Sequence, residues 1–206
     1  MIDLYTFRTP NGYKISICLE ELGIPYSVKE VNVIQGEQFK QEFLALNPNA
    51  KVPVIVDHDT GETVFESCAI LLYLADKADK LVPSSGEARW EAIQWLFFQA
   101  ASIGPMFGQR AHFEFYAPEK IPYAIDRYTR ESERLYGVLE RRLTDREYIC
   151  DEYSIVDIAH FGWIHTVKHF FGINPKQFPK LIAWYDRIAA RPAVAKGVTI
   201  PAPLPS

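Results

Sequence analysis

The stretch VPVIVDHDTGETVFESCAILLYLADKA, residues 52–78, is the most informative about the fold of this chain. It contains two short runs typical of β-strands, VPVIVD and TVFE, and the turn residues HDTGE between them predict a β-hairpin. The apolar segment SCAILLYLADKA follows at residues 67–78 and predicts a helix directly after the second strand. This stretch therefore predicts a region in which strands and helices mix.

The residues before this stretch add a β-α-β unit and a further helix. IDLYTF, residues 2–7, is a short β run, and apolar residues then recur at helical spacing from Asn11 until Gly23, which suits a left-handed helix end. PYSVKEVNV, residues 25–33, alternates like a strand, and GEQFKQEFLALNP, residues 36–48, predicts a short helix. The predicted order is β-α-β, then a helix, then β-β-α.

The pattern changes after residue 78. ADKLVPSSGE, residues 78–87, is rich in turn residues and predicts a linker. Beyond it, apolar residues recur at helical spacing in several long segments, and the Pro-rich end IPAPLPS, residues 200–206, is predicted to be irregular. We therefore expect an α/β domain at residues 1–80 and an all-helical domain at residues 88–206.

Composition excludes several classes of function. The chain has 206 residues, a formal net charge of −4 and no long run of one sign, which argues against binding to nucleic acid or to an anionic membrane surface. No apolar run reaches the roughly 18 residues of a membrane helix, and the first residues lack the pattern of a signal peptide. The three cysteines form no CxxC pair, which fits a reducing compartment and predicts a cytoplasmic location.

Two dipeptides in the stretch 52–78 suggest ligand contacts. A cis peptide bond at Val52-Pro53 would expose the backbone of Val52 to a ligand, whereas an ordinary strand-start proline explains the same residues. Ser67 can cap the following helix, whose positive end attracts a carboxylate, and Glu66 can accept a hydrogen bond from an ammonium group. An ordinary cap beside a solvated glutamate is the alternative at this position.

The order of these features resembles the glutathione transferase family over nearly the whole chain. The shared features are a Val-Pro turn before the third strand, Glu-Ser at the head of the next helix, and a helical second domain. The segments TPNGYKI, QGEQF, NPNAKVPVIVDH, FESCAILLYLA, QWLFFQ, GPMFGQ and IPYAIDRY are similar to those of the bacterial nu class. Members of that class are glutathione-dependent disulfide-bond oxidoreductases, and a yeast nitrogen-catabolite regulator with a prion arm is a divergent relative. The given sequence has no Gln/Asn-rich arm, so we do not expect the regulator's role.

The resemblance implies a thioredoxin-like first domain that binds glutathione and holds its sulfur as a thiolate. A thiol with a pKa of about 8.5 is mostly protonated at neutral pH, and lowering that pKa by ~2 units requires ~2.7 kcal/mol. The resemblance points to Thr9 and Asn11 as donors, at ~1.5–3 kcal/mol for each charge-assisted hydrogen bond. Pro10 would fix the backbone between them, and Gly12 would leave room for the ligand. A role of Asn11 as a plain helix cap remains open.

The resemblance also implies further ligand contacts. They are Gln38, Lys51, Val52, Pro53, Glu66 and Ser67 in the first domain, and Arg127 in the helical domain. Tyr5 is a rival thiolate donor or a core residue, and Cys68 is a candidate for a redox role because it lies at a helix start. SIVD, residues 154–157, is similar to the family's buried capping box and is expected to be structural.

We expect an enzyme in which activated glutathione attacks disulfides. Conjugation of glutathione to electrophilic carbon uses the same thiolate and is the nearest competitor. A glutathione-binding regulatory or partner protein without catalysis is the alternative of another class. The resemblance implies a homodimer, and we expect no metal site, since His165 and His169 share a helical face without the acidic partner of an HExxH motif.

Overall fold

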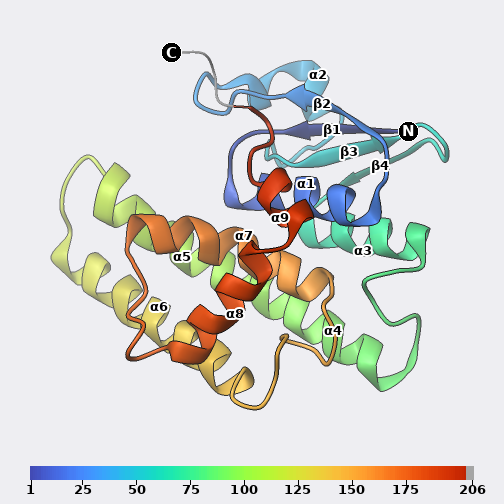
Figure 1. Ribbon diagram of the computed structural model, residues 1–206. Coiled ribbons are helices and arrows are strands. Elements are labelled where there is room, and N and C mark those ends of the chain that lie inside the picture. Colours follow the sequence, from blue (N-terminus) through green and yellow to red (C-terminus); the bar gives the residue numbers. More distant parts are fainter. Residues whose placement is uncertain (203–206) are drawn as a thin grey trace. The chain divides into compact units, whose positions relative to one another are not determined.

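The computed structural model describes residues 1–202 of the chain (Figure 1). These residues form two compact units, one made of residues 1–84 together with the chain from Ala189 onward, and one made of residues 85–188. By this division residues 189–202 group with the first unit, whereas the helical domain was predicted to extend over residues 88–206. Of the Pro-rich end, residues 200–202 lie outside helices and strands, and residues 203–206 lie outside the described residues.

The first unit has a four-stranded sheet in the order β2-β1-β3-β4. β1 and β2 are parallel, whereas β3 runs antiparallel to both β1 and β4 (Figure 1). The elements in chain order are β1 (Ile2–Thr6), α1 (Pro10–Leu22), β2 (Tyr26–Glu30), α2 (Gln41–Leu44), β3 (Val54–Asp57), β4 (Glu62–Phe65) and α3 (Ser67–Ala78). This is the predicted order and the thioredoxin-like arrangement that the resemblance implies.

The helix predicted at residues 36–48 is interrupted. A single 3₁₀ turn, Glu37–Phe39, precedes α2, and Lys40 between them has the extended backbone angles φ −66° and ψ 144°. The prediction of helical structure in this segment is therefore correct, but the segment consists of a 3₁₀ turn followed by a short α-helix.

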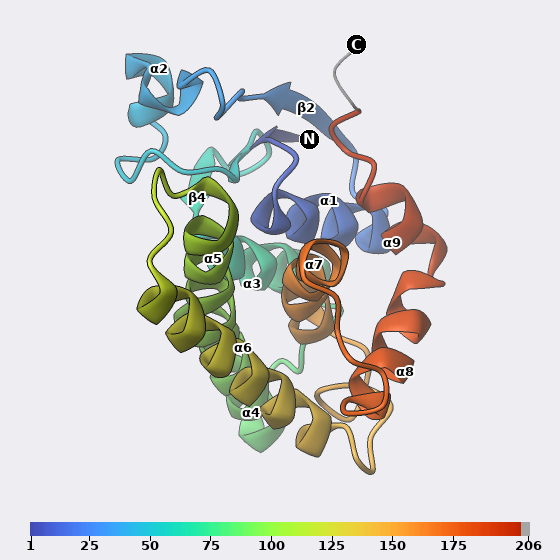
Figure 2. The same ribbon diagram turned by 90° about the vertical axis from the view of Figure 1, so that its left-hand side faces the viewer.

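The two faces of the sheet carry different helices. Ile2 and Leu4 in β1 are buried on one face, where α1 and α3 lie side by side (Figures 1 and 2). Tyr5 points to the other face and packs against Phe43 of α2 and against Val54. Since successive residues of a strand face opposite sides, Tyr5 lies on the side of the sheet away from α1.

The C-terminal helix α9 (Pro192–Gly197) packs on α1. The hydroxyl of Ser16 donates a hydrogen bond of 2.7 Å to the carbonyl of Gly197, and a Cβ atom at Gly197 would lie 2.6 Å from Cγ1 of Ile17. Arg191 forms a bidentate ion pair with Glu21, at 2.6 and 2.9 Å. These contacts explain why the chain from Ala189 onward belongs to the α/β unit.

The described elements of the second unit are helical. The helices are α4 (Gly86–Phe98), α5 (Gly104–Ala111), α6 (Pro122–Arg142), α7 (Ile155–Phe170) and α8 (Pro179–Ala189). α7 begins with the predicted capping box, in which Asp157 Oδ2 accepts from the Ser154 N–H at 3.1 Å and Oδ1 accepts from Trp184 Nε1 at 2.8 Å. Asp157 is fully buried, which confirms its structural role.

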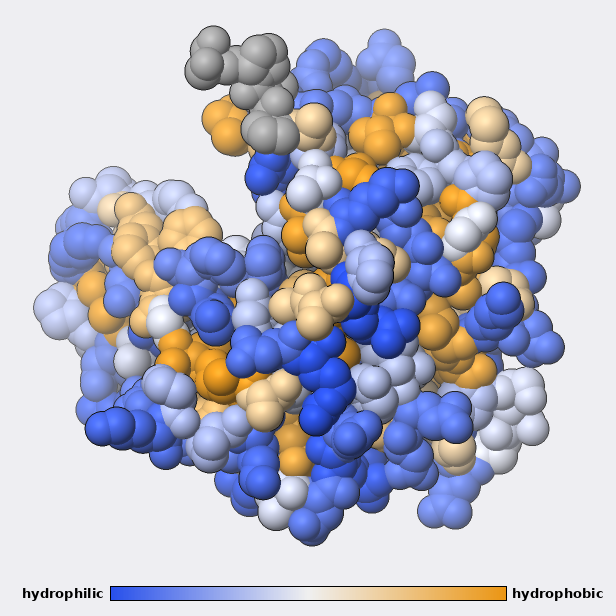
Figure 3. All heavy atoms as spheres, viewed as in Figure 1, coloured by the Kyte–Doolittle hydropathy of each residue, from blue (hydrophilic) through white to orange (hydrophobic). Residues whose placement is uncertain are grey.

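The surface is mixed in character. On the face drawn in Figure 3, hydrophobic residues occur in groups among hydrophilic ones. Within residues 1–202, no helix has both the length and the apolar composition that a membrane crossing requires.

Candidate functional site

Several chain segments meet at one edge of the sheet in the first unit. Thr6 pairs with Glu30, so the parallel strands β1 and β2 leave the sheet at this edge. β3 begins at the same edge, where Val54 pairs with Tyr5 on one side and with Phe65, the last residue of β4, on the other. The segments that continue these strands carry Thr9 and Asn11, Gln38, Lys51 to Pro53, and Glu66 with Ser67. The strand pairing therefore brings the starting points of these segments to one edge of the sheet.

Thr9 caps helix α1. Its backbone is extended, at φ −135° and ψ 157°, and its hydroxyl oxygen accepts a hydrogen bond of 3.0 Å from the backbone N–H of Gly12. The Thr9 hydroxyl hydrogen remains a donor, because the cap uses only the oxygen. Asn11 is the second residue of the helix, so its alternative role as the cap was wrong. Thr9 and Asn11 are both half-buried.

Gly12 is required by the chain itself. A Cβ atom there would lie 2.3 Å from the carbonyl oxygen of Phe7 and 2.6 Å from the hydroxyl of Thr6, so no larger residue fits. The prediction that Gly12 makes room for a ligand stays a prediction, and the structure adds a steric reason within the chain. The close approach fixes the turn from β1 into α1, and with it the position of Thr9.

The segment before β3 is held by Asn47. Its amide nitrogen donates a 2.7 Å hydrogen bond to the carbonyl of Lys51, and its carbonyl oxygen accepts a 2.9 Å hydrogen bond from the Asn49 N–H. The Val52-Pro53 peptide bond is cis, and Val52 precedes the paired residues of β3, which begin at Val54. Asn47 is 2% exposed and orders this loop, a role that the sequence analysis did not predict.

Glu66 has an unusual backbone conformation. Its φ is 68° and its ψ is 112°, a region that costs an L-residue on the order of 1–3 kcal/mol. Its side chain is exposed at the edge of the sheet. A strained residue of this kind is frequent where the chain contacts a ligand.

Ser67 is the first residue of α3 and does not act as its cap, because the cap position belongs to Glu66. Its hydroxyl instead accepts a 3.0 Å hydrogen bond from the ammonium of Lys14 on α1. Lys14 is only 1% exposed, and burial lowers its pKa to about 8. Sequence reasoning missed this residue. The available signal was a lysine four positions before Cys18, on the apolar face of the helix.

Gln38 lies in the 3₁₀ turn after β2. Its amide nitrogen donates a 3.3 Å hydrogen bond to the carbonyl of Val33. Its carbonyl oxygen is buried, and no hydrogen-bond partner for it lies within the described part of the chain. Gln38 therefore keeps one polar atom that a ligand could satisfy.

The thiols of the chain are poor nucleophiles. Burial raises the pKa of Cys18 and Cys68, and it raises the pKa of Cys150 to about 12. The hypothesis that the helix start lowers the pKa of Cys68 was wrong, because burial outweighs the nearby Lys14 ammonium. Tyr5 is also a core residue, since its ring packs against Phe43 on the face away from α1. An activated sulfur at this edge would have to come from a ligand.

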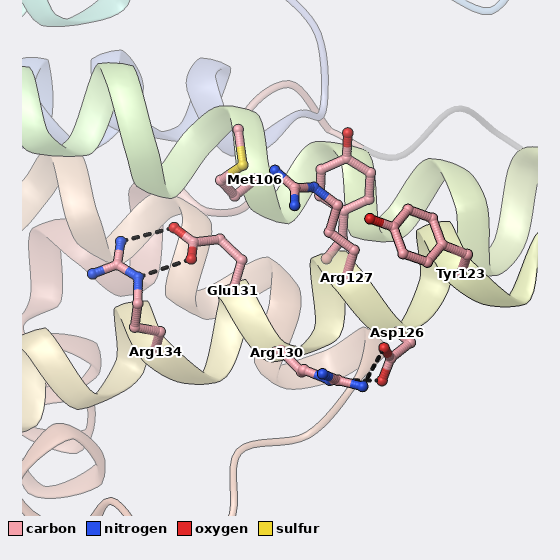
Figure 4. A pocket seen from close by; sticks show the side chains of 8 residues that line it. Met106, Tyr123, Asp126, Arg127, Arg130, Glu131 and Arg134 are labelled. Atoms are coloured by element: carbon pink, nitrogen blue, oxygen red, sulfur yellow. Dashed lines mark hydrogen bonds and ion pairs between the residues drawn. The ribbon is translucent and has the colours of Figure 1, made fainter.

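Arg127 belongs to the second unit, where it lies on α6. It lines a cavity of about 480 Å³ and points toward Met106 of α5 (Figure 4). Two other arginines of the cavity are paired, Arg130 with Asp126 at 2.5 Å and Arg134 with Glu131 at 2.7 Å. Within residues 1–202, Arg127 has no such ion pair, so its guanidinium is available to an anion.

Among the described residues, no group of His, Cys, Asp and Glu side chains is arranged to hold a metal ion. His165 contacts the hydroxyl of Tyr185 through Nδ1 at 2.9 Å, and His169 contacts the carbonyl of His165 at 2.7 Å. Both histidines thus have partners within the helical unit.

Comparison with known proteins extends over both units. Family models of the glutathione S-transferase N-terminal and C-terminal domains match residues 1–76 and 105–192. The disulfide-bond oxidoreductase YfcG of Escherichia coli is 44% identical over 96% of this chain and 94% of its own length. The structure of a glutathione transferase from Burkholderia graminis, with two glutathione molecules bound per subunit, is 44% identical with a TM-score of 0.93, over 98% of this chain and 88% of that one. A glutathione transferase from Pseudomonas putida, with one glutathione disulfide bound per subunit, is 39% identical with a TM-score of 0.90, over 98% of this chain and 92% of that one.

Proposed function

This chain belongs to the glutathione S-transferase family, and on that premise we propose that it activates glutathione to reduce disulfide bonds. One observation carries the proposal. The N-terminus of α1, capped by Thr9, opens at the sheet edge where the segments with Val52 and Ser67 also end. A tripeptide with a thiol, an amide backbone and two carboxylates has complementary groups on each of these segments.

In this proposal Thr9 and Asn11 stabilise the thiolate of glutathione. The Thr9 hydroxyl donates to the sulfur while its oxygen keeps the bond from Gly12. The Asn11 amide and the positive end of α1 add to this stabilisation. Two charge-assisted hydrogen bonds of ~1.5–3 kcal/mol each exceed the ~2.7 kcal/mol needed to lower the thiol pKa by ~2 units.

The remaining contacts hold the ends of the tripeptide. Ser67 at the start of α3 binds the carboxylate of the γ-glutamyl residue, and Glu66 accepts from its ammonium group. The backbone of Val52 beside Pro53 pairs with the cysteinyl residue. Lys51 binds the glycine carboxylate, with Gln38 alongside. The role of Arg127 as a carboxylate contact stays a prediction from the family resemblance.

The reaction is thiol–disulfide exchange between molecules in the site. The first glutathione thiolate attacks one sulfur of the substrate disulfide, forms a mixed disulfide and releases the other sulfur as a thiolate, which takes up a proton. A second glutathione thiolate then attacks the glutathione sulfur of the mixed disulfide, giving glutathione disulfide and the second reduced thiol. The raised pKa values of the chain's own cysteines favour this route over one through a protein thiol.

Similar proteins favour disulfide reduction over conjugation. YfcG is named a disulfide-bond oxidoreductase, and the Burkholderia and Pseudomonas structures hold two glutathiones or one glutathione disulfide. These are the reactants and the product of the exchange, so we assign the chain to the nu-like, disulfide-reducing group. We also propose a cytoplasmic location, because the three cysteines form no CxxC pair and fit a reducing compartment.

The test compares two substrates at equal enzyme concentration. We expect rapid reduction of 2-hydroxyethyl disulfide by glutathione, measured through NADPH consumption by added glutathione reductase, and slow conjugation of a chloronitrobenzene. Faster conjugation would reverse the assignment. Calorimetric binding of glutathione without turnover of either substrate would favour a non-catalytic glutathione-binding protein.

We also propose a homodimer. Trp90 and Phe97 lie two helical turns apart on α4 and are 66% and 67% exposed. Large aromatic side chains exposed on one helix face are typical of a protein–protein interface. A second copy of the chain is the occupant that the family resemblance implies.

A further inference from the structure

Lys14 is a buried charge directly behind the proposed carboxylate site. It lies on α1, one turn after the Thr9 cap, and its side chain crosses to the first residue of α3. The ammonium donates to Ser67 Oγ at 3.0 Å, and Glu66 and Cys68 are the titratable groups that act on it most strongly. The two side chains that share this hydrogen bond are both buried, since Lys14 is 1% exposed and Ser67 is 9% exposed.

The chemistry of this contact fixes the direction of the Ser67 hydroxyl. A protonated lysine has three donors and no acceptor, so Ser67 Oγ must be the acceptor in the bond. The hydroxyl hydrogen of Ser67 is consequently directed away from Lys14, toward another acceptor. Within the chain the neighbouring Cys68 sulfur is in reach of it, and a thiol sulfur is only a weak acceptor. A carboxylate at the N-terminus of α3 is a strong acceptor for this hydrogen. The Lys14 ammonium, on the other side of the Ser67 hydroxyl, would also attract the carboxylate by its charge.

We propose that Lys14 is a positioning residue for the γ-glutamyl carboxylate of glutathione. It orients the Ser67 hydroxyl as a donor to that carboxylate and places a compensating positive charge behind it. This inference rests on the proposed function, since it names how the same site recognises one end of the tripeptide. Lys14 acts through Ser67 and has no direct contact with the sulfur.

The burial of Lys14 supports this role. A lysine is rarely fully buried unless it is paired, because removal of the ammonium from water is unfavourable. Burial lowers the Lys14 pKa from 10.5 to about 8, so the side chain is still mostly charged at neutral pH. Burial also raises the pKa of Cys68, so that thiol is neutral at the same pH and leaves Glu66 as the nearby anion.

The experiment compares two ligands on three proteins. The ligands are glutathione and 4-aminobutanoyl-cysteinyl-glycine, which lacks only the γ-glutamyl carboxylate. The proteins are the wild type, Lys14→Met and Lys51→Met, and calorimetry gives the dissociation constants. We expect Lys14→Met to weaken glutathione binding by about tenfold or more and to leave binding of the analogue nearly unchanged. Lys51→Met should weaken both ligands equally, because both retain the glycine carboxylate.

An equal loss for both ligands in Lys14→Met, or no loss for either, would overturn the inference. Failure of the wild type to bind glutathione at all would instead defeat the proposed function, so the two failures are distinguishable. A measurement on the wild type removes any dependence on folding of the variant. With ¹³C-labelled lysine, NMR titration should show the Lys14 pKa rising when glutathione binds and remaining constant with the analogue. An equal rise with both ligands would count against the role of Lys14.

Discussion

The hydroxyl of Thr9 accepts a hydrogen bond of 3.0 Å from the backbone N–H of Gly12. One side chain therefore caps α1 and presents its own hydrogen to the edge of the sheet. Because the Thr9 hydroxyl both caps α1 and donates in the proposed chemistry, substitutions at Thr9 must separate the cap from the donor.

Thr9→Ser keeps both the cap and the donor, whereas Thr9→Ala removes both. We expect Thr9→Ala to lower disulfide reduction by about tenfold or more and to cost about 0.5–2 kcal/mol of stability through the lost cap. Asn11→Ala should lower the rate similarly, without the loss of the cap. Rates with 2-hydroxyethyl disulfide and ultraviolet titration of the bound thiolate measure these effects. Wild-type rates in both alanine variants would disprove the assignment of Thr9 and Asn11.

Gly12→Ala tests the turn between β1 and α1. The new methyl group would lie 2.3 Å from the Phe7 carbonyl oxygen, and relief of this overlap requires backbone movement. We expect a loss of about 1–3 kcal/mol in the free energy of unfolding, measured by urea denaturation. Gly137→Ala on α6 is the matched control, because its nearest atom is the flexible Arg141 guanidinium at 3.5 Å. The control should be neutral or slightly stabilising. A neutral Gly12→Ala would contradict the steric overlap at this turn.

Glu66 separates backbone strain from ligand binding. Glu66→Gly and Glu66→Gln both remove the carboxylate near the buried Lys14 ammonium, but only glycine adopts a φ of 68° without steric cost. We therefore expect Glu66→Gly to be more stable than Glu66→Gln by about 1 kcal/mol. Both variants should bind glutathione more weakly, since both lose the carboxylate that accepts from the ligand ammonium. Urea denaturation and calorimetry measure the two effects, and a glycine variant no more stable than the glutamine variant would contradict the strain.

The lowered pKa of the buried Lys14 makes the stability of the chain depend on pH. Its pKa is about 8 in the folded chain and 10.5 when exposed, so the unfolded state binds more protons between these values and stability rises with pH there. Below pH 8 the penalty of the buried charge is fully present. We therefore expect Lys14→Met to be more stable than the wild type at neutral pH, by up to about 3 kcal/mol.

The stability difference between Lys14→Met and the wild type should shrink as the pH rises from 8 toward 10.5. Urea denaturation of both proteins across this range measures it, because other groups that titrate there are common to both. A difference that is constant with pH would mean that Lys14 does not titrate as stated.

The exposed face of α4 predicts a dimer contact. We expect Phe97→Glu to shift the chain from dimer to monomer in light scattering after size-exclusion chromatography. Phe39→Glu is the control, because Phe39 is also 67% exposed but lies in the 3₁₀ turn after β2. A monomeric wild type, or an unchanged dimer in Phe97→Glu, would refute the role of this face.

The local elements could be predicted from the sequence because their signals lie within a few residues. The short β run of β1, the left-handed end of α1 at Gly23 and the capping box at Ser154 and Asp157 all follow from neighbouring residues. The resemblance to known transferases then predicted how these elements combine, as a thioredoxin-like domain followed by a helical domain. Errors of one or two positions occurred at caps, where Thr9 and Glu66 took positions expected for Asn11 and Ser67.

Only the folded chain shows which distant residues meet. Lys14 and Ser67 are separated by 53 positions, and Ser16 and Gly197 by 181. Helical periodicity states which residues share a face, but the partner of that face depends on strand register and on how each helix is rotated against its neighbours. The amino-acid order was therefore sufficient for the elements and the family. Packing determined that a lysine on an apolar face is a buried partner of Ser67, because only close contact gives that charge a hydrogen-bond acceptor.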